Sequence, residues 1–367
     1  MLHIGIDLGS RESQLCARSA DGRLLWEERV KTTEIGTLLG KEKPCRVILE
    51  SCSEAFCIAD TLKAQGHDVR IVPATMVRAL GVGLRGIKTD RRDAQRLSEA
   101  SSRVELPSVH IRSLRTREWK AQLGMRQALV ETRTQLINCV RGWLRTNLVT
   151  VRSGASETFC ARIRETMAKR DDGTPAHVDL VLQVLDEINK RIREADVLLA
   201  QAADSDPICK LLQTVPGVGV LTAMYFVWAV DKIERFANAH ALQSYLGITP
   251  GENSTGSRRQ VTSITKAGPP QVRRMLTQAC WVMLMHRPDD SLVKWAKRVA
   301  ARRGKKVAVV AMSRKLAGIL YAMWRDGTPY HPKMSAPTKK NNKDTSPKRP
   351  QKTEGRQKLT KSSTKKR

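Results

Sequence analysis

The segment from residue 46 to residue 73, RVILESCSEAFCIADTLKAQGHDVRIVP, decides the fold. Its apolar start predicts a buried strand that closes at Glu50, residues 55–65 predict a helix, and residues 69–72 predict a second strand ended by Pro73. A strand, a helix and a strand in this order are typical of a parallel crossover. We therefore predict an α/β domain with helices on the faces of its sheet.

Three more strands are predicted before this segment, at residues 2–8, 14–18 and 23–30, with Asp21 and Gly22 in the hairpin turn between the last two. Three consecutive antiparallel strands beside a parallel crossover make a mixed sheet. Asp7 and Glu50 then end two strands that we expect to be neighbours. Open sheets of this kind bind ligands at the carboxyl ends of their strands.

The segment KTDRRDA, residues 88–94, follows the sheet region and places Asp90 and Asp93 one helical turn apart, at the start of a helix predicted over residues 94–100. One interpretation is a solvated ion-pair lattice with Lys88, Arg91 and Arg92. The other is a divalent cation, because carboxylate oxygens suit Mg²⁺ or Mn²⁺, and two such ions about 4 Å apart can hold a phosphodiester. We favour a metal site with four ligands: Asp7, Glu50, Asp90 and Asp93.

The charge of the chain predicts a polyanionic partner. Its 367 residues, enough for two or three domains, include 65 Lys and Arg against 36 Asp and Glu, a net charge of +29. Residues 337–367 account for +10 of this, so +19 belongs to the rest of the chain. A basic charge spread in this way favours nucleic acid over a membrane surface.

Cysteine usage and hydropathy predict the compartment. The eight cysteines include no C-x-x-C pair and the seven histidines are scattered, which excludes a zinc ribbon or a redox motif and predicts free thiols. We find no signal peptide and no apolar run near the roughly 18 residues of a membrane span. The sequence therefore predicts a cytoplasmic protein with no membrane partner.

A helical arm is predicted after the α/β domain. Leu123, Val130, Ile137 and Leu144 recur every seven residues, and apolar residues three and four apart recur over 178–199. A possible amphipathic helix at residues 155–169 and a turn at 171–175 return the chain, so the arm is antiparallel. Its two long helices pack on each other or on a second chain, and the pattern does not decide between these.

The polar break at residues 202–207 precedes a predicted helix-hairpin-helix, in which Gly217 and Gly219 let backbone N–H groups approach a phosphate. Beyond it, a Gly-bounded hydroxyl loop at residues 251–257 is surrounded by basic residues. Guanidinium groups around a hydroxyl suit a phosphoryl-transfer nucleophile, although an ordinary loop has the same composition. The basic residues predicted to bind nucleic acid are Arg258, Arg259, Lys266, Arg273 and Arg274.

These motifs together resemble one family. The segments GIDLGS around Asp7, VILES around Glu50 and KTDRRDA around Asp90, followed by LLQTVPGVG and ITKAGPPQVRRML, resemble the DEDD-type insertion-sequence transposases, whose first domain is similar to the Holliday-junction resolvase RuvC. The resemblance implies a RuvC-like domain at 1–110, a coiled-coil arm at 111–203 and a mainly helical transposase domain at 204–332. Residues 333–367 are too poor in apolar residues to form a core and predict a disordered basic tail.

The resemblance also implies a function. Members of the family recombine donor and target DNA under the direction of a structured non-coding bridge RNA, and we expect a dimer that assembles to a tetramer. Ser254 matches the serine that links covalently to DNA, with Thr255 and Ser257 as alternatives. The expected mechanism is attack of Ser254 on a phosphodiester, with Mg²⁺ at the four acids stabilising the departing oxygen.

Three other classes share part of the pattern. A junction endonuclease would use the same first domain with water as its nucleophile. A sugar or acetate kinase shares GIDLGS, but we find no second phosphate loop. A non-enzymatic nucleic-acid binder would use the acids only structurally.

Overall fold

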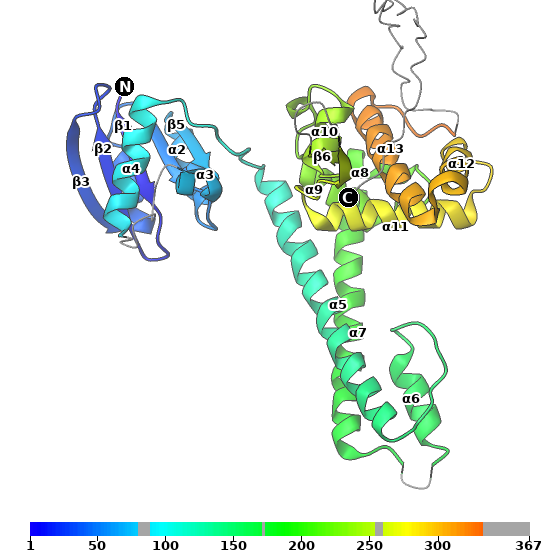
Figure 1. The fold of residues 1–367 in the computed structure, drawn as a ribbon. Coiled ribbons are helices and arrows are strands. Elements are labelled where there is room, and N and C mark those ends of the chain that lie inside the picture. Colours follow the sequence, from blue (N-terminus) through cyan, green and yellow to red (C-terminus); the bar gives the residue numbers. More distant parts are fainter. Residues whose placement is uncertain (80–88, 171–172, 254–259, 333–367) are drawn as a thin grey trace, which may run out of the picture.

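The computed structural model describes residues 1–79, 89–170, 173–253 and 260–332 (Figure 1). They form an α/β lobe, a long helical arm and a helical lobe. Ser254, Thr255, Ser257, Arg258, Arg259, Lys88 and the predicted tail at 333–367 lie outside the described residues.

The α/β lobe contains a five-stranded sheet of β1 (His3–Asp7), β2 (Glu12–Arg18), β3 (Leu24–Lys31), β4 (Arg46–Glu50) and β5 (Asp68–Val72) in the order β3-β2-β1-β4-β5. The first three strands are antiparallel, whereas β4 pairs parallel to both β1 and β5. The predicted mixed sheet is confirmed. The strands that end in Asp7 and Glu50 are neighbours, as expected.

Helices cover both faces of this sheet. On one face, α1 (Ile35–Leu39), which follows the short η1 (Thr32–Glu34), and α2 (Ala55–Ala64) pack on Ile4, Ile6, Val47 and Leu49. On the other face lies α4 (Asp90–Arg103), whose Leu97 packs on Ile48. The short α3 (Ala74–Ala79) follows β5. Helix α4 approaches β1 so closely that a Cβ on Gly5 would collide with the backbone of Ala94 and Ser98.

The arm consists of α5 (Leu114–Thr146) and α7 (Ala176–Asp204), which lie side by side, with α6 (Phe159–Met167) at the far end (Figure 1). Ile137, Val140 and Leu144 of α5 share a core with Leu182 and Leu185 of α7. The two long helices therefore pack on each other within one chain. The predicted amphipathic helix over 155–169 is present in the shorter form of α6.

The helical lobe contains α8 (Pro207–Gln213), α9 (Val220–Val230), η2 (Ile233–Arg235), α10 (Ala239–Tyr245), α11 (Pro270–His286), α12 (Ser291–Arg303), α13 (Lys305–Asp326) and a hairpin of β6 (Pro250–Glu252) and β7 (Val261–Ile264). Its core also includes Trp119 and Leu123 of α5 and Leu199 of α7, so the base of the arm is built into this lobe.

One helix, α13, is long and apolar enough to span a membrane by length and composition, although the sequence pattern predicted no such stretch. In the described structure 61% of its apolar window is buried, where it packs against α11 and α12. Its hydropathy is accounted for by its place in the core of the lobe.

Candidate active site

The carboxyl ends of β1 and β4 bring Asp7 and Glu50 to one edge of the sheet. The two strands are parallel and in register, with Ile6 opposite Leu49, so the next residue of each strand is the acid. Side chains alternate between the faces of a sheet, and Ile6 and Leu49 face α2. Asp7 and Glu50, both half-buried, therefore belong to the opposite face, which α4 covers.

Helix α4 contributes the other two acids from above that face. The Nδ1 atom of His3 lies 2.8 Å from Oγ of Ser101, and Gly5 lies beneath Ala94 and Ser98, so α4 runs antiparallel to β1. Its first turn, with Asp90 and Asp93, thus lies toward the Asp7 end of the strand. Asp93 is 3% exposed, whereas Asp90 is exposed to solvent.

One of the neighbouring bases, Arg91, pairs with an acid outside the four predicted ligands, whereas Lys88 lies outside the described residues, so the ion-pair lattice stays an alternative interpretation. Nη2 of Arg91 lies 2.5 Å from the carboxylate of Glu27 on β3, a largely buried acid that also accepts a hydrogen bond from Gln95. Arg91 is therefore directed to the neighbouring edge of the sheet. The pair holds α4 on the sheet rather than neutralising Asp90.

The four acids fit a divalent cation by chemistry, since they supply only hard oxygen donors from three separate segments. The side chains as they lie do not form a finished site: among the described residues no group of three or more His, Cys, Asp or Glu is arranged to hold a metal ion. The fold thus brings the acids to one edge, and shared coordination by all four stays a prediction.

The predicted hairpin is present between α8 and α9, and its two glycines have different roles. Gly217 has a φ of +84°, and a Cβ there would lie 2.6 Å from the carbonyl oxygen of Ala279, so it permits close packing on α11. Gly219 has no atom within 4 Å of its Cβ position. It is the N-cap of α9 and supplies no capping side chain, which leaves the first-turn N–H groups accessible to an anion.

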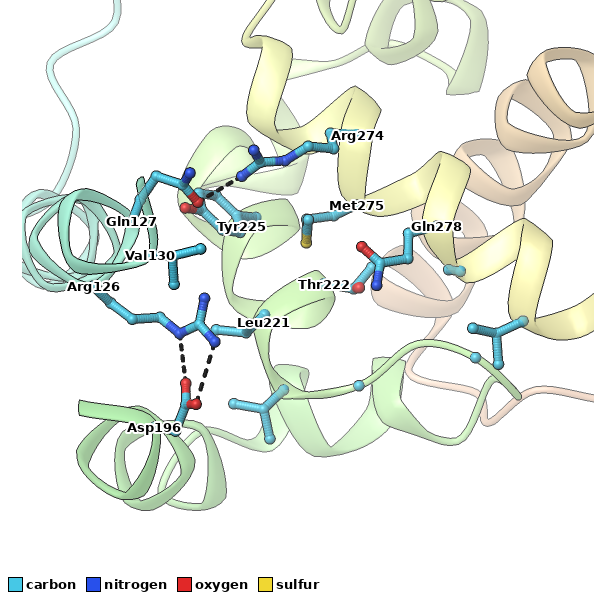
Figure 2. Close-up of a pocket in the computed structure, with 15 residues that line it drawn as sticks. Arg126, Gln127, Val130, Asp196, Leu221, Thr222, Tyr225, Arg274, Met275 and Gln278 are labelled. Atoms are coloured by element: carbon cyan, nitrogen blue, oxygen red, sulfur yellow. Dashed lines mark hydrogen bonds and ion pairs between the residues drawn. The ribbon is translucent and has the colours of Figure 1, made fainter. Parts of the chain in front are cut away.

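The N–H groups of the first turn of α9 open into a cavity of about 650 Å³ between the base of the arm and the helical lobe (Figure 2). We call it the hairpin cavity. Nε and Nη2 of Arg126 on α5 donate to the carboxylate of Asp196 on α7, at 2.5 and 3.2 Å. Across the cavity, Nη2 of Arg274 on α11 donates to Oε1 of Gln127 at 2.7 Å. Arg126 and Gln127 were missed in the sequence because the heptad pattern marks only the apolar residues of α5.

The other predicted basic residues have different environments. Nη1 of Arg273 donates to the carbonyl oxygens of Leu246, at 3.2 Å, and Gly268, and burial lowers the pKa of its guanidinium. Arg273 therefore holds a turn inside the lobe. Lys266 is exposed and adopts a left-handed φ of 58°.

The hydroxyl loop connects β6 to β7. The N–H of Asn253 donates to the carbonyl oxygen of Gln260 at 2.9 Å, so the two ends of the loop are held together. The predicted nucleophile Ser254 and the arginines at 258 and 259 fall between these ends, outside the described residues. Their roles stay predictions.

Two family models match the chain. One, described as "Transposase", matches residues 4–147, and a second, described as "Transposase IS116/IS110/IS902 family", matches residues 209–294. The first range contains the four acids and α5, and the second contains the hairpin, the hydroxyl loop and α11.

Two curated transposases match over most of their length. The chain is 28% identical over 326 residues to the transposase for insertion sequence element IS1111A of Coxiella burnetii, which covers 87% of this chain and 88% of that protein. It is 26% identical over 336 residues to a probable family 20 transposase of Pseudomonas aeruginosa, covering 90% and 98%. A shorter match, 30% over 122 residues, is to a pilin gene-inverting protein of Moraxella bovis, covering 33% of this chain and 38% of that protein.

Proposed function

This chain belongs to the DEDD-type insertion-sequence transposases and is a DNA transposase, and we propose that it excises and inserts its element under the direction of a structured guide RNA. The observation that carries the catalytic part is the convergence of Asp7, Glu50 and the first turn of α4 on one face of the sheet. The division into a RuvC-like domain, an arm, a transposase domain and a tail is part of the same proposal.

A transposase domain of this class depends on a divalent metal ion. We assign the ligands to Asp7, Glu50, Asp90 and Asp93, and the ion to Mg²⁺ or Mn²⁺. When bound, such an ion supplies positive charge against phosphodiester oxygens. Burial of Asp93 in the first turn of α4 strengthens its interaction with any cation at this edge, because the local dielectric constant is low.

The proposed nucleophile is the hydroxyl of Ser254. The hydroxyl gives up its proton as its oxygen forms a bond to phosphorus, the bond from phosphorus to one deoxyribose oxygen breaks, and that departing oxygen takes up a proton, so the step consumes no net proton. The phosphoserine link conserves the energy of the broken bond, so strands can be rejoined without ATP. The four acids and the β6–β7 hairpin lie in separate lobes (Figure 1). The acids and the hydroxyl loop must therefore be brought together in the working complex.

Nucleic-acid binding is assigned to the basic surface. The hairpin, the accessible N-terminus of α9 and Arg274 contact the DNA backbone in this proposal, with Lys266, Arg258 and Arg259 close to the hydroxyl loop. Such contacts position DNA but do not read its sequence. Sequence choice is left to the guide RNA, which the resemblance implies and the net charge of +29 supports. A dimer that assembles to a tetramer and a cytoplasmic location complete the proposal.

The test uses the full chain with its guide RNA, donor DNA and Mg²⁺. Asp90→Asn should abolish strand cleavage while DNA and RNA binding persist, because the basic surface is intact. Ser254→Ala should abolish the covalent protein–DNA adduct, with Thr255→Ala and Ser257→Ala as matched controls. Cutting and joining by Ser254→Ala at the wild-type rate would remove the serine step. Cleavage by the wild type without any adduct would favour the junction endonuclease that uses water.

A further inference from the structure

The far end of the arm contains a second basic cavity. It has a volume of about 340 Å³ and lies between the last turns of α5, the segment at residues 149–153 and the start of α6. Four of its lining residues are arginines: Arg141, Arg145, Arg152 and Arg162. Figure 1 shows this tip at the end of the arm that points away from both lobes. None of these arginines was predicted as a binding residue.

The charge of the cavity is only partly compensated. Arg152 lies 3.5 Å from the carboxylate of Glu165, an exposed pair of little energetic weight. Arg141 stacks on the ring of Phe159 at 5.6 Å, and neither it nor Arg145 has a carboxylate partner in the described parts of the chain. Both are exposed, so their guanidinium groups are available to a ligand in the cavity.

Arg162 forms the inner wall and is only 5% exposed. Its Nη1 donates to the carbonyl oxygen of Ala155 at 2.9 Å and to the hydroxyl of Thr158, and it packs against Gly154, so the guanidinium is held in place. Its Nε is buried and has no acceptor among the described residues. Arg162 has no carboxylate partner among the described residues, and an anion in the cavity that Arg162 lines would compensate its charge.

An exposed apolar residue beside the cavity indicates the kind of anion. Leu148 is 91% exposed and has a φ of 54°, a conformation that costs a branched residue about 1 kcal/mol. It directly precedes the cavity-lining Val149. Some nucleic-acid-binding proteins insert an apolar side chain such as Leu against a base step while neighbouring basic side chains contact the groove. This favours nucleic acid over a small free phosphate.

We propose that the arm tip binds a backbone phosphate of nucleic acid in the cavity formed by Arg141, Arg145 and Arg162, with Leu148 against a neighbouring base. The site lies at the other end of the arm from the hairpin cavity. It rests on the proposed function only in that nucleic acid is the substrate. A contact at this distance extends the footprint beyond the DNA that is cut.

The matched variants are Arg141→Gln with Arg145→Gln at the tip, and Lys190→Gln with Arg193→Gln on α7 as the control. The control side chains are exposed, do not line the cavity and have no carboxylate partner in the described structure, and both double variants lose two positive charges. Thermal melting checks that both proteins fold.

Binding of a labelled DNA duplex and of a labelled stem-loop RNA is measured in EDTA over a range of KCl concentrations. The tip variant should bind one or both probes about ten-fold more weakly, with a slope of log K against log salt reduced by about 2, whereas the control keeps the wild-type slope. Loss with DNA alone or RNA alone assigns the source of the phosphate. Equal affinities and slopes for tip and control variants would overturn the inference.

Hydrogen exchange on the wild-type protein gives an independent result. At least one of the two probes should slow exchange of the amides at residues 147–153, and unchanged exchange there with both probes contradicts the proposal. Strand cleavage with Mg²⁺ is assayed separately. A tip variant that binds normally while the wild type cleaves DNA refutes only the tip site, and a wild type that never cleaves refutes only the proposed function.

Discussion

His110 and Asp231, 121 positions apart in the chain, are joined by a hydrogen bond of 2.6 Å between Nε2 and a carboxylate oxygen. His110 belongs to the extended segment between α4 and α5, whose alternate residues face different lobes. Val109 and Ile111 pack on the core of the α/β lobe, whereas Nη2 of Arg112 donates to the hydroxyl of Tyr245 at 2.8 Å. Because successive side chains of this extended segment point to opposite sides, one short segment contacts both lobes.

Replacing Asp231 by Asn should loosen this junction. The carboxylate is buried and also accepts hydrogen bonds from Oγ of Ser113 at 2.5 Å and Oγ1 of Thr116 at 2.8 Å. We expect the free energy of unfolding to fall by about 2 kcal/mol, measured by denaturant titration. Asp326→Asn, which breaks an exposed pair with Arg325, is the control and should change it by less than about 0.5 kcal/mol. Equal decreases in the free energy of unfolding for the two variants would show that the hydrogen bonds of Asp231 do not stabilise the protein.

The same carboxyl group predicts a loss of stability in acid. Burial acts to raise the pKa of Asp231, but hydrogen bonds from Ser113, His110 and Thr116 outweigh it and lower the pKa from 3.8 to about 2. Because the folded pKa lies below the unfolded one, this stabilisation is complete above pH 3.8 and disappears as the pH falls through about 2. Wild type should lose about 2 kcal/mol more than Asp231→Asn across this window. If stability falls with pH equally in the wild type and in Asp231→Asn, the prediction is wrong.

Gly5→Ala should displace α4 from the sheet. The added methyl group would meet the carbonyl oxygen of Ala94 and the amide nitrogen of Ser98, both of them backbone atoms that cannot turn aside. We expect a loss of about 2 kcal/mol or more in stability and weaker strand cleavage, because Asp90 and Asp93 move with the helix. Thermal melting and a cleavage assay measure both effects. Gly124→Ala, where the Cβ position is open, should leave both unchanged or raise stability slightly.

Removal of divalent metal should separate binding from chemistry. EDTA is expected to abolish strand cleavage, and Mg²⁺ or Mn²⁺ should restore it, while DNA binding persists because arginines and lysines supply it. Asp93→Asn should behave like the metal-free protein at every Mg²⁺ concentration. Full cleavage by Asp93→Asn in Mg²⁺ would exclude Asp93 as a ligand.

Arg274→Gln should weaken DNA binding at the hairpin cavity. Arg274 is exposed and its one hydrogen bond in the described structure is to the neutral Gln127, so its charge remains available to a phosphate. We expect affinity for duplex DNA to fall about five-fold and the salt slope to fall by about 1. Arg193→Gln removes the same charge from the surface of α7 and should keep the wild-type slope. A slope that does not change for Arg274→Gln would place the DNA elsewhere.

The strands, the crossover and the two long helices were predictable because each depends on a local period. Short segments rich in Val, Ile and Leu around residues 4, 48 and 71 match β1, β4 and β5, and the heptad residues at 123, 137 and 144 are buried in α5. The placement of Asp7 and Glu50 at the ends of neighbouring strands also followed from the topology alone. Val130 departs from the pattern: it is half-buried because it lines the hairpin cavity.

By itself, the sequence determined the mixed sheet, the acids at its strand ends, the antiparallel arm and the basic charge, since composition and short-range periodicity encode these. Only the tertiary structure decided that the two long helices of the arm pack on each other and that Arg91 pairs with Glu27. It also decided that Arg273 donates to the carbonyl oxygens of a turn, whereas Arg162 lines a cavity. Each of these is a contact between segments far apart in the chain. A charged side chain has the same appearance in a sequence whether it is paired, buried or open to a ligand, because its partner is chosen by the packing of the folded chain.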